Sequence, residues 1–447
     1  MRGRGGGSLR EIRVSAGYNK DERREFTVSL PSPDGTFEAV ARIEVNKDPT
    51  KAPRLINVDK YALDPPGPDR TAEQRETHII LSLGSGHVQA ASFFQDVVSP
   101  ILTVLYGPEG MRKMRIDRTR SATSILDFTN ERIFPEANGT SNIDLTVDQF
   151  GLKEHAAKPL RIILLSGDGG IVDLVNGLSS KPTRDVYVAP QVVLLPLGTA
   201  NALYHSINVG KPNTWGLSAL SSPTSTPLPI FTATFSPGAR LLVDEARKEE
   251  QLSKDAQGNG VLHGAVVCSW AMHASLVADS DTTAFRKYGV ERFKMAAKEA
   301  LYPSDNSPPH AYKGCISVLK DDEWRLIEED VHTYVLATLV SHLEQPFCIS
   351  PASKPLDGSM HLVHFGPRGG DEVMRIMGLA YQGGLHVEEG DIRYEDIDGL
   401  RIEFRGKEEE GRWRRICVDG KIVRVETDGW VEVRKERRRV VDIIVDA

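Results

Sequence analysis

The pattern of apolar and polar positions changes character between the two halves of the chain. Over residues 76–225, short apolar runs such as 78–83 and 161–165 alternate with segments whose apolar residues recur at helical spacing. Strands that alternate with helices favour a parallel sheet, because each helix carries the chain back to the end of the sheet where the next strand starts. We therefore expect a Rossmann-like α/β domain over this part of the chain.

Within this domain the periodicity predicts several further elements. Residues 89–105 carry apolar side chains at helical spacing, and Pro100 should kink that helix or end it early. A strand near 113–117 and a helix over 121–134 continue the alternation. The polar residues 135–158 that follow are expected to form an inserted loop.

From residue 226 to 447, apolar and polar residues alternate over short stretches that are separated by turn residues. This rhythm is typical of antiparallel strands and predicts a β-sandwich as the second domain. One helical segment, 278–293, interrupts it. The expected strands lie at 231–242, 261–270, 311–319, 331–339, 360–365, 401–404, 415–418, 422–425 and 431–433.

The residues before the α/β domain are of two kinds. Residues 1–22 begin with a run of glycine and arginine that has nothing to bury, and we expect a disordered tail there. Over 23–75, two alternating stretches flank the turn Pro-Ser-Pro-Asp-Gly (31–35), and a linker rich in Pro, Asp and Gly follows. We expect these strands to pack on the β domain.

The composition argues against several classes of protein. With a formal net charge of −7, the chain lacks the positive field that nucleic-acid binding needs. Its 4 cysteines are scattered and form no Cys-x-x-Cys pair, which indicates a reducing compartment and no zinc site. Because the sequence has no apolar run of about 20 residues, we expect a cytoplasmic protein whose membrane contact, if it has any, is peripheral.

One stretch carries residues that chemistry explains better than packing. The strand over 161–165 leads into the glycine turn 167–170, and a helix with apolar residues at helical spacing opens from that turn. Backbone N–H groups and the helix dipole then favour an anion such as phosphate. Asp168 would repel a phosphate held only by amides, which favours a role as general base. The alternative is an ordinary turn, since Asp and Gly are typical turn residues.

A second loop supports the chemical interpretation. The strand over 191–196 leads into Leu-Gly-Thr-Ala-Asn (197–201), which precedes a short helix that ends near Ile207. In a parallel sheet both loops lie at the carboxyl edge, where ligands of open α/β sheets bind. The sequence therefore predicts one ligand site built from two glycine-containing loops.

These two motifs carry a resemblance to a known family. The run Ser-Gly-Asp-Gly-Gly-Ile-Val-Asp-Leu-Val-Asn-Gly-Leu (166–178), followed by Leu-Pro-Leu-Gly-Thr-Ala-Asn-Ala-Leu (195–203), resembles the catalytic domain of the diacylglycerol kinase, sphingosine kinase and ceramide kinase superfamily. The serine before Gly-Asp-Gly is closer to the sphingosine kinases. The resemblance implies ATP and Mg²⁺ as cofactors, a lipid substrate, and a site in the cleft between an α/β domain and a β-rich domain.

The resemblance also implies which residues bind the nucleotide. The family's short loop after its first strand corresponds to 84–86 here, although Ser82 stands where the family commonly has Asn and no basic residue lies in the loop. Thr119, at the next strand-to-helix turn, is placed to reach a phosphate. The nucleotide-binding set is Gly84, Ser85, Gly86, Thr119, Ser166, Gly167, Gly169, Gly170, Gly198, Thr199, Asn201, Arg286, Arg292, Asp419, Gly420 and Lys421.

A lipid site is implied in the helical segment 278–293. There Arg286 and Arg292 match the arginines with which sphingosine kinases hold the triphosphate, and either Asp279 or Asp281 matches the acid that holds the lipid head group. Guanidinium groups suit phosphate oxygens, and an ionised carboxylate suits an amine or a hydroxyl. The alternative is a helix whose acids and bases only complement its dipole.

Two late motifs complete the comparison with the family. Asp357 and Gly358 resemble part of a family loop, which makes Asp357 a candidate metal ligand, and Asp419-Gly420-Lys421 resembles the late Asp-Gly-Glu motif. Lys421 reverses the charge of that motif, so either it contacts a phosphate or the kinase activity is weakened or lost. Read from the residues alone, Asp419-Gly420 is a two-residue hairpin turn beside a solvated lysine.

The sequence thus predicts an ATP-dependent lipid kinase that phosphorylates a primary hydroxyl, with a sphingoid base preferred and Asp168 as the proton acceptor. A diacylglycerol or ceramide kinase is the nearest alternative. An NAD kinase-like enzyme shares a similar glycine loop, and a catalytically weak lipid-binding homologue would account for Lys421 and Ser82.

Overall fold

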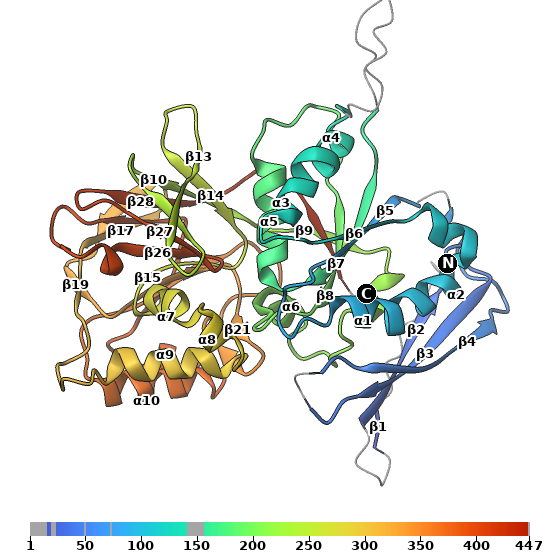
Figure 1. The fold of residues 1–447 in the computed structure, drawn as a ribbon, viewed down its shortest axis with the longest axis horizontal. Helices are drawn as coiled ribbons and strands as arrows, with labels where there is room; N and C mark the ends of the chain where they lie inside the picture. The colour runs from blue at the N-terminus through green and yellow to red at the C-terminus, as the bar shows by residue number, and fades with distance from the viewer. Residues whose placement is uncertain (1–15, 19–23, 49–50, 72–73, 141–155, 446–447) are drawn as a thin grey trace, which may run out of the picture.

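The computed structural model describes residues 16–18, 24–48, 51–71, 74–140 and 156–445 (Figure 1). Most of the predicted disordered tail and of the predicted loop 135–158 therefore lies outside the described residues. Within the tail, β1 (Ala16–Tyr18) is described and pairs with β2.

The α/β domain is built on a largely parallel sheet, as predicted. Its strand order is β6-β5-β7-β8-β29-β9, and every neighbouring pair is parallel except β29 with β9. The strands are β5 (Glu76–Leu81), β6 (Arg115–Arg118), β7 (Leu160–Ser166), β8 (Gln191–Pro196), β9 (Ser225–Pro227) and β29 (Asp442–Ile444).

Helices connect these strands. The helix predicted over 89–105 is α1 (Ala90–Phe93), a π-helical turn (Phe94–Val98) and α2 (Ser99–Lys113) in succession. Pro100 lies in the first turn of α2, directly after the π-helical turn, and the helix continues beyond it, so Pro100 does not end the helix early. The remaining helical elements are α3 (Ser124–Phe128), a π-helical turn (Thr129–Ile133), α4 (Phe134–Ala137), α5 (Asp168–Ser179) and α6 (Ala202–Ile207).

The N-terminal strands pack on the α/β domain, and the prediction that they pack on the β domain is wrong. β2 (Arg24–Pro31), β3 (Phe37–Val45) and β4 (Arg54–Ala62) form an antiparallel sheet with β1. Figure 1 shows this sheet beside α1 and α2. The physical reason is a shared apolar core, in which the sheet contributes Phe26, Val28, Leu30, Ala39, Ala41 and Ile43 and the helices contribute Phe93, Val97, Ile101 and Leu105.

The second part of the chain is β-rich and antiparallel. Most of its described strands form two large sheets, with the orders β13-β14-β10-β28-β25-β17-β18 and β12-β11-β27-β26-β15-β20-β23-β24, and both sheets contribute side chains to one buried cluster. Two further sheets have two strands each, β16 (Tyr312–Lys313) with β19 (Val331–His332) and β21 (His342–Glu344) with β22 (Phe347–Cys348). The strands are β10 (Phe231–Phe235), β11 (Arg240–Val243), β12 (Lys248–Gln251), β13 (Ser253–Lys254), β14 (Gly260–Gly264), β15 (Val267–Ala271), β17 (Cys315–Lys320), β18 (Glu323–Leu326), β20 (Tyr334–Thr338), β23 (Met360–Phe365), β24 (Arg393–Ile397), β25 (Gly399–Glu403), β26 (Arg415–Val418), β27 (Lys421–Arg424) and β28 (Trp430–Lys435).

The chain does not stay in the β domain after residue 226. β29 inserts between β8 and β9, with Asp442 opposite Gln191 and Ile443 opposite Val192. The buried residues Val440, Val441 and Ile443 explain this return, because they complete the apolar core beneath the parallel sheet. The predicted division into 76–225 and 226–447 did not anticipate it.

Helices also lie on the β domain. They are α7 (Met272–Ser280), α8 (Thr283–Arg286), α9 (Glu291–Leu301) and α10 (Gly370–Ala380). The first three correspond to the predicted helical segment 278–293 and extend beyond it. None of the helices in the described part of the chain has the length and apolar character that crossing a bilayer requires.

Candidate active site

The site begins where the parallel strands end, because three loops meet at the carboxyl edge of the sheet. The loops after β7 and β8 approach so closely that a Cβ on Gly167 would lie 2.5 Å from the Cα of Gly198, and a Cβ on Gly198 would lie 2.4 Å from the Cα of Gly167. Only glycine fits at both positions. The two motifs that predicted the site are therefore packed backbone to backbone.

Polar side chains fix the shape of these loops. The Gly167 N–H donates to Ser85 Oγ (3.1 Å), and the Leu83 N–H donates to Thr119 Oγ1 (2.8 Å). The Gly198 N–H donates to Asn201 Oδ1 (2.8 Å). Three predicted nucleotide-binding side chains, those of Ser85, Thr119 and Asn201, thus hold the loops in shape. Gly169 is open, since a Cβ there would meet nothing within 4 Å.

Asp168 joins the first loop to the next helix. Its carboxylate accepts the N–H groups of Ala202 (2.8 Å) and Leu203 (3.0 Å) at the start of α6. Burial raises the pKa of Asp168, although these two hydrogen bonds act in the opposite direction. A carboxylate has about four lone-pair sites, so it retains acceptor capacity for a substrate proton.

Asp419 approaches from the β domain. Val418 and Lys421 pair across the predicted two-residue turn, in which Asp419 and Gly420 both have positive φ. The Asp419 carboxylate is buried and accepts the N–H groups of residues 265–267, with distances of 3.1 Å to Val266 and 2.6 Å to Val267. Burial raises the pKa of Asp419 to about 7, and the nearby negative charge of Asp168 adds to this shift. The charge of Asp168 in the α/β domain is therefore felt by Asp419 of the β domain.

Lys421 crosses the same boundary. Its ammonium group lies 2.6 Å from Oδ1 of Asp173 on α5, and the two side chains are 28% and 10% exposed. Burial raises the pKa of Asp173, and the Lys421 charge opposes that shift. Lys421 is thus not solvated alone but neutralises an acid of the first motif, and its contact with a phosphate stays a prediction.

Sequence reasoning missed the role of Asn176 at the end of that motif. Its side-chain amide donates to the His263 carbonyl (2.8 Å) and accepts the His263 N–H (2.9 Å), so it pairs with β14 as a strand would. Together with Asp173, it makes α5 the helix that connects the two domains. The signal was present in Asn-Gly-Leu, but nothing in one sequence shows which strand the amide would meet.

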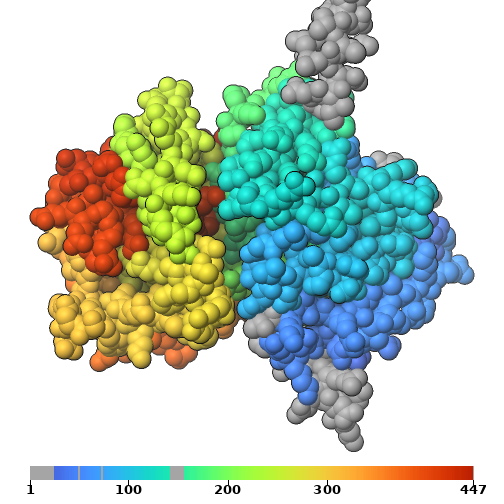
Figure 2. Space-filling model, in the orientation of Figure 1, coloured from blue at the N-terminus to red at the C-terminus, as the bar shows by residue number. Residues whose placement is uncertain are grey.

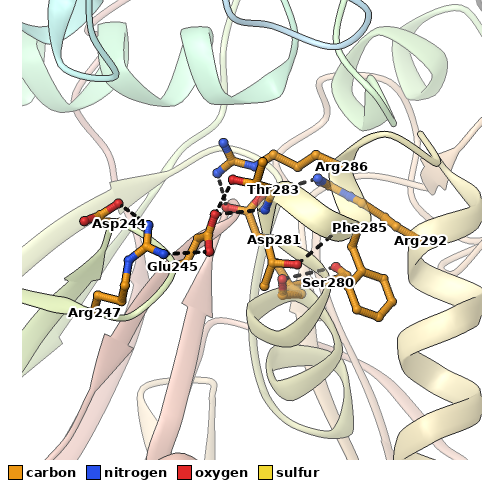
Figure 3. A network of polar contacts seen from close by, with 11 residues as sticks. Asp244, Glu245, Arg247, Ser280, Asp281, Thr283, Phe285, Arg286 and Arg292 are labelled. Atoms are coloured by element: carbon orange, nitrogen blue, oxygen red, sulfur yellow. Dashed lines mark hydrogen bonds and ion pairs between the residues drawn. The ribbon is translucent and has the colours of Figure 1, made fainter.

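Arg286, Arg292 and Asp281 form one charged cluster (Figure 3). Arg286 binds Asp281 through two bonds of 2.9 Å, and Arg292 lies 3.2 Å from the same carboxylate. Thr283 donates its N–H to Glu245 (2.9 Å), which extends the network to Arg247. The structure thus brings together the two arginines that were predicted to bind the triphosphate, and both of them bind Asp281.

The other predicted acids lie apart from this cluster. Asp279 binds Arg415 at 2.7 Å. Asp357 is exposed in the loop before β23 and accepts the Ser359 N–H (2.9 Å), so its metal role stays a prediction. Among the described residues, the acids and histidines close enough to share a metal ion are Glu76, His78 and Glu136, but Lys158 and Arg115 already neutralise the two glutamates at 3.0 and 3.3 Å.

A large cavity opens beside these loops. Its volume is about 1330 Å³, and its walls come from the β8–α6 loop, the β3–β4 loop and the turn between α8 and α9. In Figure 2 the boundary between the two domains is a furrow that runs down the molecule. Gly198, Thr199 and Asn201 line the cavity, which places part of the predicted nucleotide loop at its wall.

Comparison with known proteins agrees with this arrangement. Residues 137–232, which contain β7, α5, β8 and α6, match the model of the diacylglycerol kinase catalytic domain. This part of the chain is therefore similar to the diacylglycerol kinase catalytic domain. No curated protein matches the chain.

Two solved structures have a fold similar to that of this chain. A diacylglycerol kinase from Bacillus anthracis str. Sterne is 13% identical with a TM-score of 0.50, and the match covers 83% of this chain and 97% of that chain. A putative diacylglycerol kinase from the same organism is 14% identical with a TM-score of 0.52, covering 83% and 95%. At such identities the likeness concerns the fold, so the closeness to sphingosine kinases stays a prediction.

Proposed function

We propose that this chain is a cytoplasmic, ATP-dependent lipid kinase that phosphorylates the primary hydroxyl of a sphingoid base or a related lipid. The reaction would take place between the α/β domain and a β-sandwich. The family match supports a lipid kinase of the diacylglycerol kinase type. The choice of a sphingoid base rests on the serine before Gly-Asp-Gly and on the arginine cluster of α8 and α9.

The observation that carries the proposal is the position of Asp168. Its carboxylate lies at the first glycine loop and is held by two N–H groups, and its negative charge raises the pKa of Asp419 in the β domain. Burial raises its pKa, which brings its basicity nearer to the pH at which a general base works best. Asp168 would accept the hydroxyl proton as the lipid oxygen attacks the terminal phosphate of ATP.

Magnesium is expected to enter as Mg-ATP. Lys421 already neutralises Asp173, and both Asp168 and Asp419 accept backbone N–H groups. Because these acids already have partners, they would supply only one or two ligands to the ion, and the nucleotide phosphates would supply most of the others. Mg²⁺ is commonly bound in this way. Bound there, the ion would neutralise charge on the transferring phosphoryl group. The chain would supply Asp168 as base, the glycine loops as cradle, and Arg286 and Arg292 as phosphate contacts.

The function is tested by transfer of labelled γ-phosphate from ATP to a panel of acceptors: sphingosine, dihydrosphingosine, ceramide, diacylglycerol and NAD. We expect label in the sphingoid bases and none with the Asp168→Asn variant. Label only in diacylglycerol or ceramide would mean that the chain is a lipid kinase with a different substrate. Label in NAD would overturn the lipid proposal, and lipid binding without transfer would identify a catalytically weak homologue.

A variant of Arg286 tests the phosphate contacts. Arg286→Ala should raise the KM for ATP about tenfold, because a charge-assisted hydrogen bond is lost, and should change kcat by much less. Arg247→Ala is the matched control, since Arg247 belongs to the same network and is exposed to a similar extent, 62% against 57%. Equal effects of the two variants on KM would mean that Arg286 acts only within the network.

A further inference from the structure

A row of polar side chains crosses the parallel sheet at its amino edge, at the opposite end of the strands from the glycine loops. The strand register places Thr77 of β5 beside Arg161 of β7. Gln191 of β8 lies next in the row, between Arg161 and Asp442 of β29. Arg75 directly precedes β5, so it stands at the same edge of the sheet. The amino edge thus gathers two arginines and an acid from separate segments of the chain.

The Arg161 guanidinium is fixed in position but is not fully paired. Its Nη1 donates to the Leu220 carbonyl (3.3 Å) and to Tyr106 Oη (3.3 Å). Its Nη2 donates to the Ser222 carbonyl (2.7 Å). The Nε atom is buried and has no hydrogen-bond partner among the described residues, and the same is true of Nη1 of Arg75. Two guanidinium groups at this edge therefore hold a donor that lacks an acceptor.

A hydroxyl group lies beside the Arg161 guanidinium. Ser221 stands between the two residues whose carbonyl groups accept from Arg161, and its Oγ is also buried and unpaired within the described part of the chain. Three segments of the chain thus each bring one buried polar atom without a partner to this edge. Because buried polar groups in native proteins almost always have partners, such atoms indicate a bound water or ion.

The charges at the amino edge favour an anion over water. Burial lowers the pKa of Arg75, the charge of Asp442 raises it, and the charges of Arg161 and Arg439 lower it. Asp442 is the acid that acts on Arg75 among the described residues, yet Arg439 already binds both of its oxygens, one of them at 2.7 Å. Three arginines therefore share one carboxylate. A partly buried excess of positive charge is unfavourable unless a counter-ion neutralises it.

We propose that Arg75, Arg161 and Ser221 form a binding site for a phosphate-type oxyanion at the amino edge of the sheet. Guanidinium groups form charge-assisted hydrogen bonds with phosphate oxygens. A tetrahedral anion presents oxygens in several directions, which suits donors that come from three segments. The site is distinct from the candidate active site, because it lies where β5 and β7 begin and the glycine loops lie where the strands end. It does not rest on the proposed function.

A bound anion would stabilise the junction of β29 with the sheet. Gln191 Nε2 donates to Ser225 Oγ (2.9 Å), and Ser225 Oγ donates to Asp442 (3.4 Å). Asp442 is the first residue of β29, so the polar row reaches this strand through Ser225. Neutralising Arg75 and Arg161 would remove the repulsion between positive charges beside this contact. We therefore expect phosphate to stabilise the folded protein as well as to bind it.

The test is isothermal titration calorimetry of the full chain with inorganic phosphate at constant ionic strength. Arg75→Gln should weaken phosphate binding at least about tenfold, because a hydrogen bond to a charged group is lost. Arg75→Lys should also weaken it, since lysine keeps the charge but lacks the planar group. Ser221→Ala, which removes only a hydroxyl, should weaken it about threefold. Phosphate should raise the melting temperature of the wild type and leave that of Arg75→Gln nearly unchanged.

Two control variants separate this site from other positive charge on the protein. Arg325→Gln changes an arginine on β18 that is 56% exposed and lies 3.7 Å from Glu323, and it should bind phosphate as the wild type does. Arg286→Ala removes a predicted phosphate contact of the candidate active site, and the binding that depends on Arg75 should persist in it. Glycerol 3-phosphate, titrated in parallel, distinguishes a phosphate ester from the free anion. Tighter binding of the ester that is lost in Arg75→Gln would support the site and assign it to an ester.

Four outcomes would overturn the proposal. If phosphate does not bind the wild type, water fills the site. If acetate binds as tightly as phosphate, the site does not select a phosphate-type anion. Wild-type affinity in Arg75→Lys, or equal losses in Arg75→Gln and Arg325→Gln, would show that phosphate responds only to overall charge. Loss of binding in Arg286→Ala without any loss in Arg75→Gln would assign the bound phosphate to the candidate active site.

Discussion

The Asp168→Asn variant should lower the turnover number by about a hundredfold or more, because it removes the proposed proton acceptor. The asparagine has one oxygen that can accept one of the two α6 N–H groups. Its NH₂ group cannot accept the second N–H group, so one hydrogen bond is lost. A loss of about 1 kcal/mol in the free energy of unfolding is therefore expected as well. Steady-state kinetics at saturating lipid and ATP, with chemical denaturation in parallel, would measure both effects.

A second variant separates the two roles of Asp168. Ser206 lies on the same helix, donates to the His342 carbonyl (3.1 Å) and accepts the His342 N–H (2.9 Å). Ser206→Ala should loosen α6 by about 1 kcal/mol while leaving Asp168 in place. If it lowered turnover as much as Asp168→Asn, the contribution of Asp168 would be structural rather than that of a base.

The Lys421→Glu variant should lower the free energy of unfolding by roughly 3 kcal/mol. It removes the ammonium group that now lies 2.6 Å from Oδ1 of the largely buried Asp173, and it places a second carboxylate near that acid. The variant restores the sign of charge found in the family motif, yet the partner residue in this chain makes that restoration unfavourable. Urea denaturation of the wild type and the variant measures the loss.

The charge-swapped protein, with Asp173→Lys and Lys421→Asp together, provides the control. If the ion pair itself stabilises the contact between domains, the swap should recover a good part of the loss seen in either single variant. Strictly additive losses would show that the two residues act independently. Such a result would also weaken the view that α5 holds the domains together through this pair.

Much of the fold could be predicted because it follows from patterns of residues that are close together in the sequence. The alternation of apolar runs and helical spacing indicated the parallel sheet, and Asp419-Gly420 indicated the hairpin turn that the structure has. The glycine loops were found because close backbone approach restricts the residue type, as at Gly167 and Gly198. These features depend on residues that are near in sequence or on positions where few residue types fit.

The features that sequence reasoning missed depend on distant partners. Asn176 could be seen as polar, but its partner His263 is far along the chain and is contacted through its backbone, which any residue offers. Lys421 could be seen as a departure, but its effect is decided by Asp173. The N-terminal sheet has an apolar face that fits either domain by pattern, and only the three-dimensional arrangement selects α1 and α2.

The position of β29 has a consequence for how the protein is made. Residues 442–444 lie between β8 and β9, so the sheet that carries the glycine loops has a gap until these residues have left the ribosome. During synthesis β8 and β9 would present open edges, which are prone to wrong pairing. The sheet of the α/β domain therefore cannot be completed before the β domain has been translated.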